Sequence, residues 1–258
     1  MELLLAVTAS LAAGFIDAIV GGGGLILVPA LFAAYPAAAP ATLFGTNKGA
    51  AIWGTALATW RYARRVELRW ASLLPAVGTA LLGSTLGAWG ATQVDARLWR
   101  IALPVILLGL LVYTLAKKNL GRAHAPAYSG SAEALRAMAI GGGIGLYDGF
   151  FGPGTGSFFI FLFVRVLGYD FLHASASAKL LNTATNAAAL TLFAATGHLW
   201  WGVAACMAVA NMLGSWLGAH LALARGAGFV RGVFLVVVSA LIVKTGWDAA
   251  ITWTTVMA

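Results

Sequence analysis

The chain contains, at residues 14–29, the segment GFIDAIVGGGGLILVP, which places one acidic residue and four consecutive glycines inside an otherwise apolar run. The acid is Asp17, and the glycines occupy positions 21–24. Four glycines in a row weaken a helix and favour a break in it. The segment therefore predicts a helix that is interrupted within strongly apolar surroundings.

A related segment, GLYDGFFGPGTG, begins 131 residues further on, at Gly145. With the same offset and no gaps, Asp17 falls on Asp148 and Lys48 falls on Lys179. The pattern GSxLGA also occurs twice with this spacing. Glycine matches alone would mean little in a chain with 32 glycines. One offset that aligns an acid, a lysine and a longer pattern indicates an internal duplication.

The composition is typical of a helical membrane protein. Hydrophobic residues make up 61% of the 258 positions and charged residues only 9%, whereas about a quarter of a soluble domain is charged. Several apolar segments approach the roughly 20 residues that cross a bilayer, and no extended alternation of polar and apolar residues indicates a β-barrel. The net charge of +8 is then interpreted as positive loops that orient the chain, and no nucleic-acid partner is expected.

The duplication and the apolar segments predict an all-α, polytopic fold in two halves, residues 1–120 and 137–258, joined by a polar cytoplasmic linker at 121–136. Residues 24–34 are too short to cross a bilayer, and 3–20 and 24–34 laid end to end are too long for one crossing. Each half is therefore expected to begin with a glycine-broken re-entrant hairpin, followed by three transmembrane helices. The expected hairpins are 3–34 and 137–165, and the expected spans are 43–60, 71–90, 98–116, 175–192, 202–222 and 231–250.

The loop charges predict that the two halves are inverted across the membrane. The loop at 61–69 carries four arginines and the linker is also basic, which places both in the cytoplasm. The equivalent loop of the second half, around Thr196, contains no Lys or Arg. The same loop then faces opposite sides in the two halves, as in inverted-repeat transporters. A parallel arrangement with four full spans per half is the alternative.

Lys48 and Lys179 lie at equivalent places, a few residues into apolar segments. A charged side chain near the bilayer centre costs roughly 2.5–3.5 kcal/mol, so two equivalent lysines favour a functional role. Two ammonium groups that meet between the halves would form a compact anion site. The alternative is that each lysine snorkels to the interface from the start of its helix.

Asp17 and Asp148 each precede a glycine break by four residues, and each lies 31 residues before a lysine. One interpretation is an ion pair between the acid and the lysine of the same half, which would offset the cost of burying both. The other is a carboxyl group that carries a proton and couples its transfer to substrate movement. The sequence leaves both open.

The glycine breaks and the polar residues near the lysines complete the predicted substrate site. Unwound backbone exposes N–H groups, and the partial positive charge at a half-helix N-terminus favours anions. The candidate backbone donors are Gly22, Gly23, Gly24, Gly154, Thr155 and Gly156. The candidate side chains are Thr46, Asn47, Ser177, Asn182 and Asn186. The alternatives are that the glycines only permit close helix packing and that the polar side chains only link helices.

No catalytic residues, metal ligands or cofactor motif are expected. Cys206 is the single cysteine, the four histidines show no metal-ligand spacing, and no nucleophile–base pair is apparent. The glycine-rich segment at 152–157 lacks the lysine and the preceding strand of a nucleotide-binding loop. The chain is therefore expected not to be an enzyme. The small-xxx-small pairs in GSTLG and GSWLG indicate helix contacts or a homodimer face.

The segments FIDAIVGGGG, PAL and TNK of the first half, with GPGTG of the second, resemble the TauE/SafE family of sulfite exporters and 4-toluene sulfonate uptake permeases. The similarity covers essentially the whole chain. It implies a bacterial inner-membrane permease for small sulfur-containing anions such as sulfite, thiosulfate or organosulfonates. Thr155 stands where many members continue the glycine run, which predicts that the two half-sites are less symmetric here. Members differ in substrate and in direction, so the resemblance fixes neither.

The expected function is a secondary transporter for such an anion, embedded in the lipid bilayer, with protons coupled through Asp17 or Asp148 as a hypothesis. No ATP-binding motif is present, which disfavours primary transport by this chain alone. One alternative is a passive anion channel. Another is a membrane-embedded accessory subunit or enzyme without transport activity.

Overall fold

The computed structural model of the protein describes residues 1–93 and 123–257. Every regular element in these two ranges is a helix, which confirms the predicted all-α class. The span expected at 98–116 lies outside the described residues.

The first half contains four described helices: α1 (Glu2–Val20), α2 (Gly24–Ala34), α3 (Pro40–Ala63) and α4 (Trp70–Ala91). The break between α1 and α2 falls on the glycine run. Gly21 ends α1 in the left-handed conformation, with φ 76°, and its N–H donates to the carbonyl oxygen of Asp17. Glycine adopts this conformation without the steric penalty that other residues meet. The predicted interruption of the helix is therefore confirmed.

The second half repeats this succession with α6 (Gly130–Phe150), α7 (Thr155–Leu162), a π-helical turn η1 (Phe163–Leu167), α8 (Phe171–Ala195) and α9 (Trp201–Met257). The starts of α7, α8 and α9 lie 131 residues after the starts of α2, α3 and α4. Helix α9 bends at Gly226, where φ is 72° and ψ is −169°. The duplicated sequence thus folds into the same order of helices twice.

The start of the second half differs from the expected boundary. Helix α6 begins at Gly130, so the segment 130–136, expected as linker, is helical. Its first turn is held by Glu133, which forms an ion pair with Arg69 at 2.7 Å and accepts a hydrogen bond from the hydroxyl of Tyr169. These contacts with distant segments stabilise residues 130–136 as a helix, although their polar composition suggested a linker.

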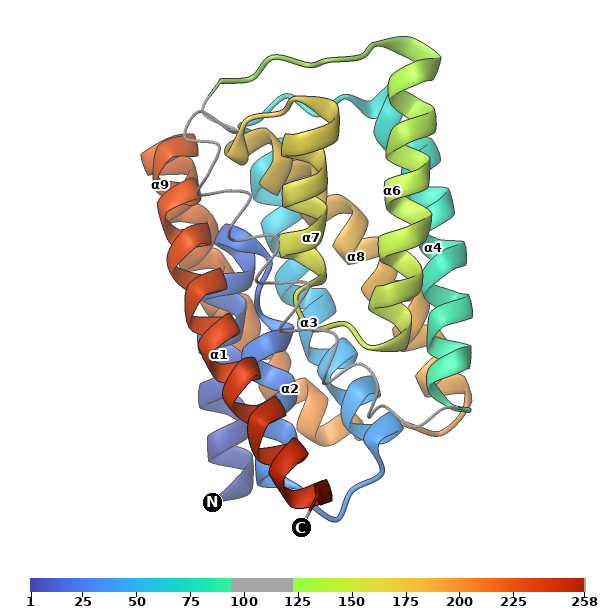
Figure 1. Ribbon diagram of the computed structural model, residues 1–258, viewed down its shortest axis with the longest axis vertical. Helices are drawn as coiled ribbons and strands as arrows, with labels where there is room; N and C mark the ends of the chain where they lie inside the picture. The colour runs from blue at the N-terminus through green and yellow to red at the C-terminus, as the bar shows by residue number, and fades with distance from the viewer. Residues whose placement is uncertain (94–122, 258) are drawn as a thin grey trace.

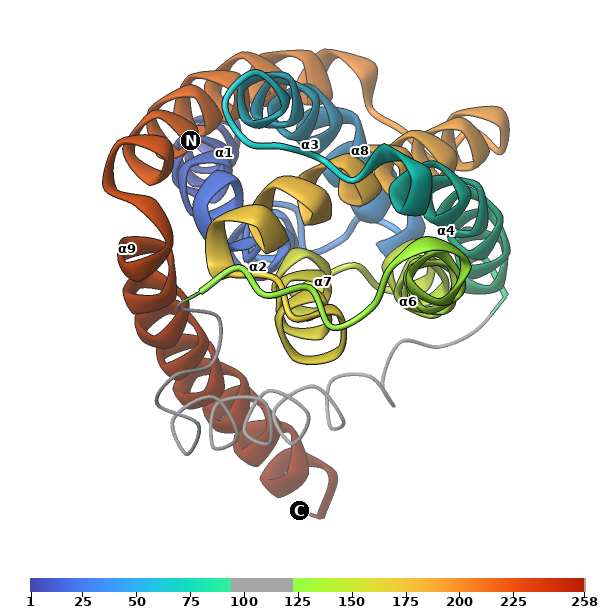
Figure 2. The same cartoon turned by 90° about the horizontal axis from the view of Figure 1, so that it is seen from above.

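The two broken helices enter the molecule from opposite ends (Figure 1). Helix α1 starts at the lower end and α6 starts at the upper end, and each returns to its own end through the short helix α2 or α7. Seen from above, α2 and α7 lie inside a ring of longer helices (Figure 2). The glycine breaks of both halves therefore meet near the middle of the molecule.

Backbone contact joins the two breaks. A Cβ atom added to Gly21 would lie 2.2 Å from the carbonyl carbon of Gly156, so neither position accepts a side chain without displacement. The N–H of Ser157 donates to the carbonyl oxygen of Gly21 at 3.2 Å, and its hydroxyl donates to that of Val20 at 2.8 Å. Close packing therefore accounts for part of the glycine run.

The exposed surface and the helix lengths are those of a membrane protein. Within residues 1–93 and 123–257, three helices are long and apolar enough to cross a bilayer, namely Glu2–Val20, Trp70–Ala91 and Trp201–Val237. Large apolar side chains such as Leu82 and Leu213 are well exposed, as is expected of helices that face lipid.

Positive charge gathers at one end of the molecule. The segment 64–69 at the upper end in Figure 1 contains three arginines, whereas 35–39 and 196–200 at the lower end contain no Lys or Arg. This distribution is compatible with an upper end in the cytoplasm. The inversion of the halves across the membrane stays a prediction and is part of the function proposed below.

Candidate substrate site between two crossed ion pairs

The two lysines form ion pairs with acids of the opposite half. The Nζ atom of Lys48 on α3 lies 2.7 Å from Oδ1 of Asp148 on α6. The Nζ atom of Lys179 on α8 lies 2.7 Å from Oδ2 of Asp17 on α1. The pairing expected within each half is therefore wrong. Because the hairpins enter from opposite ends and meet centrally, each acid faces the long helix of the other half, which the spacing of 31 residues does not reveal.

Both pairs are buried. The Lys179 residue is 0% exposed and Lys48 is 3% exposed, so the alternative that these lysines snorkel to the interface is wrong. Removing one partner of a buried ion pair typically costs about 3–5 kcal/mol, because the remaining charge is left uncompensated. The two pairs therefore tie the halves together where the glycine breaks meet.

The two carboxylates differ in their hydrogen bonds. Asp17 uses both oxygens, since Oδ1 accepts from the N–H of Gly23 at 3.3 Å and Oδ2 faces Lys179. Asp148 concentrates its contacts on Oδ1, which also accepts from the hydroxyl of Thr155 at 2.7 Å. Its Oδ2 is buried and has no hydrogen-bond partner among the described residues. The sequence predicted unequal half-sites from Thr155, and the contacts of Thr155 with Asp148 agree with that prediction.

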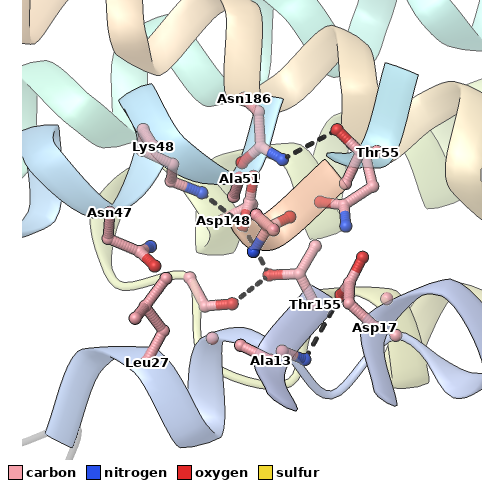
Figure 3. Close-up of a pocket in the computed structure, with 17 residues that line it drawn as sticks. Ala13, Asp17, Leu27, Asn47, Lys48, Ala51, Thr55, Asp148, Thr155 and Asn186 are labelled. Carbon is pink, nitrogen blue, oxygen red and sulfur yellow. Dashed lines mark hydrogen bonds and ion pairs between the residues drawn. The ribbon is translucent and has the colours of Figure 1, made fainter. Parts of the chain in front are cut away.

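A small cavity of about 30 Å³ is lined by the Lys48–Asp148 pair and by Asp17 of the other pair (Figure 3). One water molecule needs about 10–15 Å³ of cavity space, so this cavity has room for about two. It is bounded by both glycine breaks and by the polar faces of α3 and α8. Of the predicted site residues, those on its wall are Asp17, Gly23, Gly24, Asn47, Lys48, Asp148, Thr155, Gly156, Asn182 and Asn186.

Five predicted site residues are not on the cavity wall: Gly22, Thr46, Gly154, Ser177 and Lys179. Lys179 lies directly behind Asp17, which does line the cavity. Thr46 donates to the carbonyl oxygen of Thr42 and accepts from the N–H of Trp200, so it joins α3 to the start of α9. Gly154 precedes α7 in the left-handed conformation, with φ 84°.

Several of the predicted backbone donors already have acceptors. The N–H of Gly23 donates to Asp17, and the N–H of Thr155 donates to the carbonyl oxygen of Gly152 at 3.2 Å. Gly24 and Gly156 contribute backbone directly to the cavity wall. In this conformation, the glycine breaks therefore hold the hairpin tips and the acids in place as well as lining the cavity.

Sequence reasoning missed Thr55 as a lining residue, although a signal was present. Thr55 lies 131 residues before Asn186, and the amide of Asn186 donates to the Thr55 hydroxyl at 3.5 Å. Because Asn186 was predicted as a site residue, the duplication also indicated Thr55, its equivalent in the first half. Asn211 also lines the cavity, and its amide donates to the carbonyl oxygen of Ser10 at 3.1 Å, so α9 and α1 are joined there. The other lining residues outside the prediction are Ala13, Gly21, Leu27, Ala51 and Gly152.

A second polar cluster lies at the upper end of the molecule. The ligand atoms of His124, Asp170 and His173 all lie within 4.8 Å of one another, although the sequence showed no metal-ligand spacing. Both carboxylate oxygens of Asp170 lie 2.9 Å from Nδ1 of His173, and the two imidazole rings are stacked with centroids 3.8 Å apart. Stacked rings do not direct two nitrogens at one ion, since a bound metal lies in the plane of each imidazole. We therefore interpret this cluster as a cap for the start of α8.

The environment shifts two pKa values in this cluster. Burial raises the pKa of Asp170, but hydrogen bonds from His173 outweigh burial and leave it below its ordinary value. Burial and the nearby His173 lower the pKa of His124 below its ordinary value of 6.5.

The fold and the site together define a polytopic helical membrane transporter. Its helices are apolar outside, and its buried charges lie between two helices that glycines interrupt near the centre of the molecule, as in broken-helix transporters.

The chain belongs to the family described as "Sulfite exporter TauE/SafE", which matches residues 6–245. The chain is 36% identical over 237 residues to "Probable membrane transporter protein ORF9" of Sinorhizobium sp, which covers 92% of this chain and 89% of that one. It is 35% identical over 237 residues to "Probable membrane transporter protein YfcA" of Escherichia coli K12, covering 92% and 87% of the two chains. A Haemophilus influenzae protein, "Probable membrane transporter protein", is 34% identical over 243 residues and covers 92% and 91%. No solved structure matches the chain.

These relationships confirm that the chain is a multi-pass membrane transporter of the bacterial cell membrane and not an enzyme. They also confirm the family that the glycine and lysine motifs indicated.

Proposed function

We propose that the protein carries a small sulfur-containing anion, such as sulfite, thiosulfate or an organosulfonate, across the membrane by alternating access. The anion would take the place of the carboxylates of Asp17 and Asp148 beside Lys48 and Lys179. The observation that carries this proposal is the pair of buried salt bridges that cross between the halves.

The charges of the site support competition between substrate and carboxylate. Two lysines and two aspartates sum to zero when all four are ionised, so the resting site offers no uncompensated charge to an anion. A sulfur oxyanion accepts the same hydrogen bonds from an ammonium group that a carboxylate accepts. The amides of Asn47, Asn182 and Asn186 stand on the cavity wall as further donors.

The size of the cavity supports a coupled opening. A cavity of about 30 Å³ has room for about two water molecules, so binding of a larger anion would require it to widen. Widening the cavity requires the two halves to move apart, and both ion pairs connect the halves. Movement of one half against the other would therefore separate lysine from carboxylate at the moment that space for the anion appears.

The same contacts support proton coupling as part of the proposal. A proton on an aspartate removes its charge, releases its lysine for the anion and keeps the occupied site near neutrality. Asp148 suits this role better than Asp17, because its Oδ2 is buried without a hydrogen-bond partner among the described residues. We therefore assign proton uptake to Asp148 within the proposal.

The sulfur chemistry rests on the description of the family, which names sulfite export. Proteoliposomes with labelled sulfite, thiosulfate and a sulfonate, each with and without a pH gradient, test it directly. We expect accumulation of at least one of these anions against its concentration gradient when a pH gradient is imposed. A flux that only dissipates the anion gradient would identify a passive channel instead, and binding without any flux would identify an accessory subunit.

The inverted topology is tested separately by thiol labelling. In a Cys206→Ser background, single cysteines replace Arg65 and Thr196, which occupy equivalent positions in the two halves. Labelling of the two cysteines from opposite sides of intact vesicles is expected, with Arg65→Cys reacting from the cytoplasmic side. Labelling from the same side would refute the inversion.

A further inference from the structure

A hollow of about 550 Å³ opens at the upper end of the molecule, away from the substrate cavity. Its lining residues come from the end of α3, the first turn of α8 and the middle part of α9. Its polar wall consists of Arg61, Arg64, Arg65 and His220, and its aromatic wall consists of Trp60 and Trp216. We call this feature the arginine groove.

Aromatic rings hold two of the guanidinium groups in place. The guanidinium carbon of Arg61 lies 5.0 Å from the ring centre of Trp216, and Arg61 also donates to the carbonyl oxygen of that residue at 3.2 Å. The guanidinium carbon of Arg64 lies 4.8 Å from the ring centre of Trp60. Cation–π contacts of this kind orient an arginine through the face of its guanidinium group and do not use its N–H groups. In Arg61 a second nitrogen also lies 3.3 Å from Nδ1 of His220.

No acid neutralises these arginines within the described part of the chain. The lining of the groove includes no Asp or Glu, and none of the ion pairs found in residues 1–93 and 123–257 involves Arg61, Arg64 or Arg65. Arg69, a few residues further on, is paired with Glu133 at 2.7 Å. The groove is therefore a concentrated positive site that has no carboxylate counter-ion among the described residues.

The duplication provides an internal control for the meaning of this charge. At the positions 131 residues after Arg61, Arg64 and Arg65, the second half has an apolar residue twice and a threonine once. A requirement for cytoplasmic positive charge explains arginines somewhere in this loop. That requirement does not explain why three arginines line one hollow together with two tryptophans. Binding of an anionic ligand would explain this arrangement.

We propose that the arginine groove binds the phosphate headgroup of an anionic phospholipid of the cytoplasmic leaflet. Guanidinium groups bind phosphate through paired hydrogen bonds, and basic pockets between membrane helices hold anionic headgroups. Trp60 and Trp216 are 56% and 49% exposed, as is typical of rings at the membrane interface. Leu223 on the wall of the groove and exposed Leu217 on the same helix lead towards the lipid-facing surface, where acyl chains would lie.

The test compares lipid binding by matched variants of the full chain in detergent. The double variant Arg64→Gln/Arg65→Gln removes two groove charges. The control Arg136→Gln removes an arginine that also stacks on an aromatic ring, Tyr128 at 3.8 Å, outside the groove. Native mass spectrometry with added phosphatidylglycerol or phosphatidylcholine measures retention, and thermal unfolding with the same lipids measures stabilisation.

We expect wild-type protein and Arg136→Gln to bind phosphatidylglycerol in preference to phosphatidylcholine. The double variant should lose this preference, with affinity for phosphatidylglycerol reduced about tenfold or more. Equal binding of phosphatidylglycerol by the double variant would overturn the proposal. Inorganic phosphate that stabilises the protein as strongly as the lipid would also overturn it, in favour of a free-anion site.

A second variant, Arg64→Lys/Arg65→Lys, keeps the loop charge and so protects folding and orientation. It replaces planar, two-pronged donors with point charges, and an intermediate loss of phosphatidylglycerol binding is expected. Affinity equal to wild type in this variant would reject specific headgroup recognition by guanidinium groups. Because the measurement is lipid binding, its outcome is independent of the proposed transport activity.

Discussion

The Asp17–Lys179 pair and the Asp148–Lys48 pair occupy equivalent positions in a duplicated chain, yet their surroundings differ. The Asp17 side chain is 13% exposed and uses both of its oxygens. The Asp148 side chain is 2% exposed, and one of its oxygens is buried without a partner among the described residues. The duplicated chain therefore keeps both crossed ion pairs, but the carboxylate of Asp148 is more buried and less fully hydrogen-bonded than that of Asp17.

A single substitution in the glycine break explains part of this difference. Gly24 in the first half corresponds to Thr155 in the second, and the Thr155 hydroxyl donates to Oδ1 of Asp148. That bond and Lys48 both act on Oδ1, which leaves Oδ2 unsatisfied. A buried carboxylate oxygen without a hydrogen-bond partner is costly to keep out of water. This difference is the basis on which the proposed function assigns proton uptake to Asp148 and not to Asp17.

Removing a lysine should have the largest effect. Lys48→Ala leaves Asp148 buried without its charge partner, and we expect a loss of about 3–5 kcal/mol in unfolding free energy together with loss of anion binding. Lys179→Ala should also abolish binding but cost less stability, because Asp17 is more exposed and keeps its bond to Gly23. Thermal unfolding of both purified variants measures the loss of stability, and an anion-binding assay measures the loss of affinity.

The paired variant Lys48→Met/Asp148→Asn provides the matched control for these losses. It removes both charges at once, so stability should return towards that of the wild type while transport stays absent. Unchanged anion affinity in Lys48→Ala and Lys179→Ala would reject the lysines as substrate ligands.

Neutralising the acids one at a time should separate the two half-sites by function. Asp148→Asn cannot take up a proton, so we expect anion transport that no longer responds to a pH gradient. Asp17→Asn should keep that response, with weaker transport because Lys179 loses its charge partner. Counterflow and gradient-driven uptake in the same proteoliposomes distinguish these outcomes. A pH response that disappears only in Asp17→Asn would reverse the assignment.

Converting the second glycine break to the sequence of the first should have a moderate effect. Thr155→Gly removes the hydroxyl that donates to Asp148, a bond to a charged group worth about 1.5–3 kcal/mol. We expect lower stability and a shifted pH profile of transport, whereas Thr155→Ser keeps the hydroxyl and should stay close to wild type. Identical profiles for all three proteins would show that Thr155 does not produce the asymmetry.

The sequence predicted the helix order and many of the site residues, because both are local or repeated properties. The glycine run ends α1 through backbone conformation, and equivalent lysines follow from a constant offset. The partner of each lysine was not predictable in this way. Pairing of Lys48 with Asp148 depends on how two hairpins enter the molecule and meet, and loop charges gave only their expected orientation. The spacing of 31 residues suggested that each acid pairs with the lysine of its own half, whereas in the structure Lys179 pairs with Asp17 of the other half.

The smallest expected effect is that of His124, which lies outside both half-sites, on stability at low pH. Measuring it separates loss of stability from the effects of Asp17 and Asp148 on transport. Burial and His173 lower the pKa of His124, which also faces Asp170, Arg69 and Glu133. Between that lowered pKa and the ordinary value of 6.5, the unfolded chain binds more protons than the folded one, so stability should fall as the pH drops below 6.5. His124→Asn has no imidazole to titrate, and its melting temperature should decline less between pH 7.5 and pH 5.5. If the melting temperatures of the two proteins decline equally, His124 is not the source of the acid sensitivity. The pH dependence of transport attributed to Asp148 then needs no correction for titration of His124.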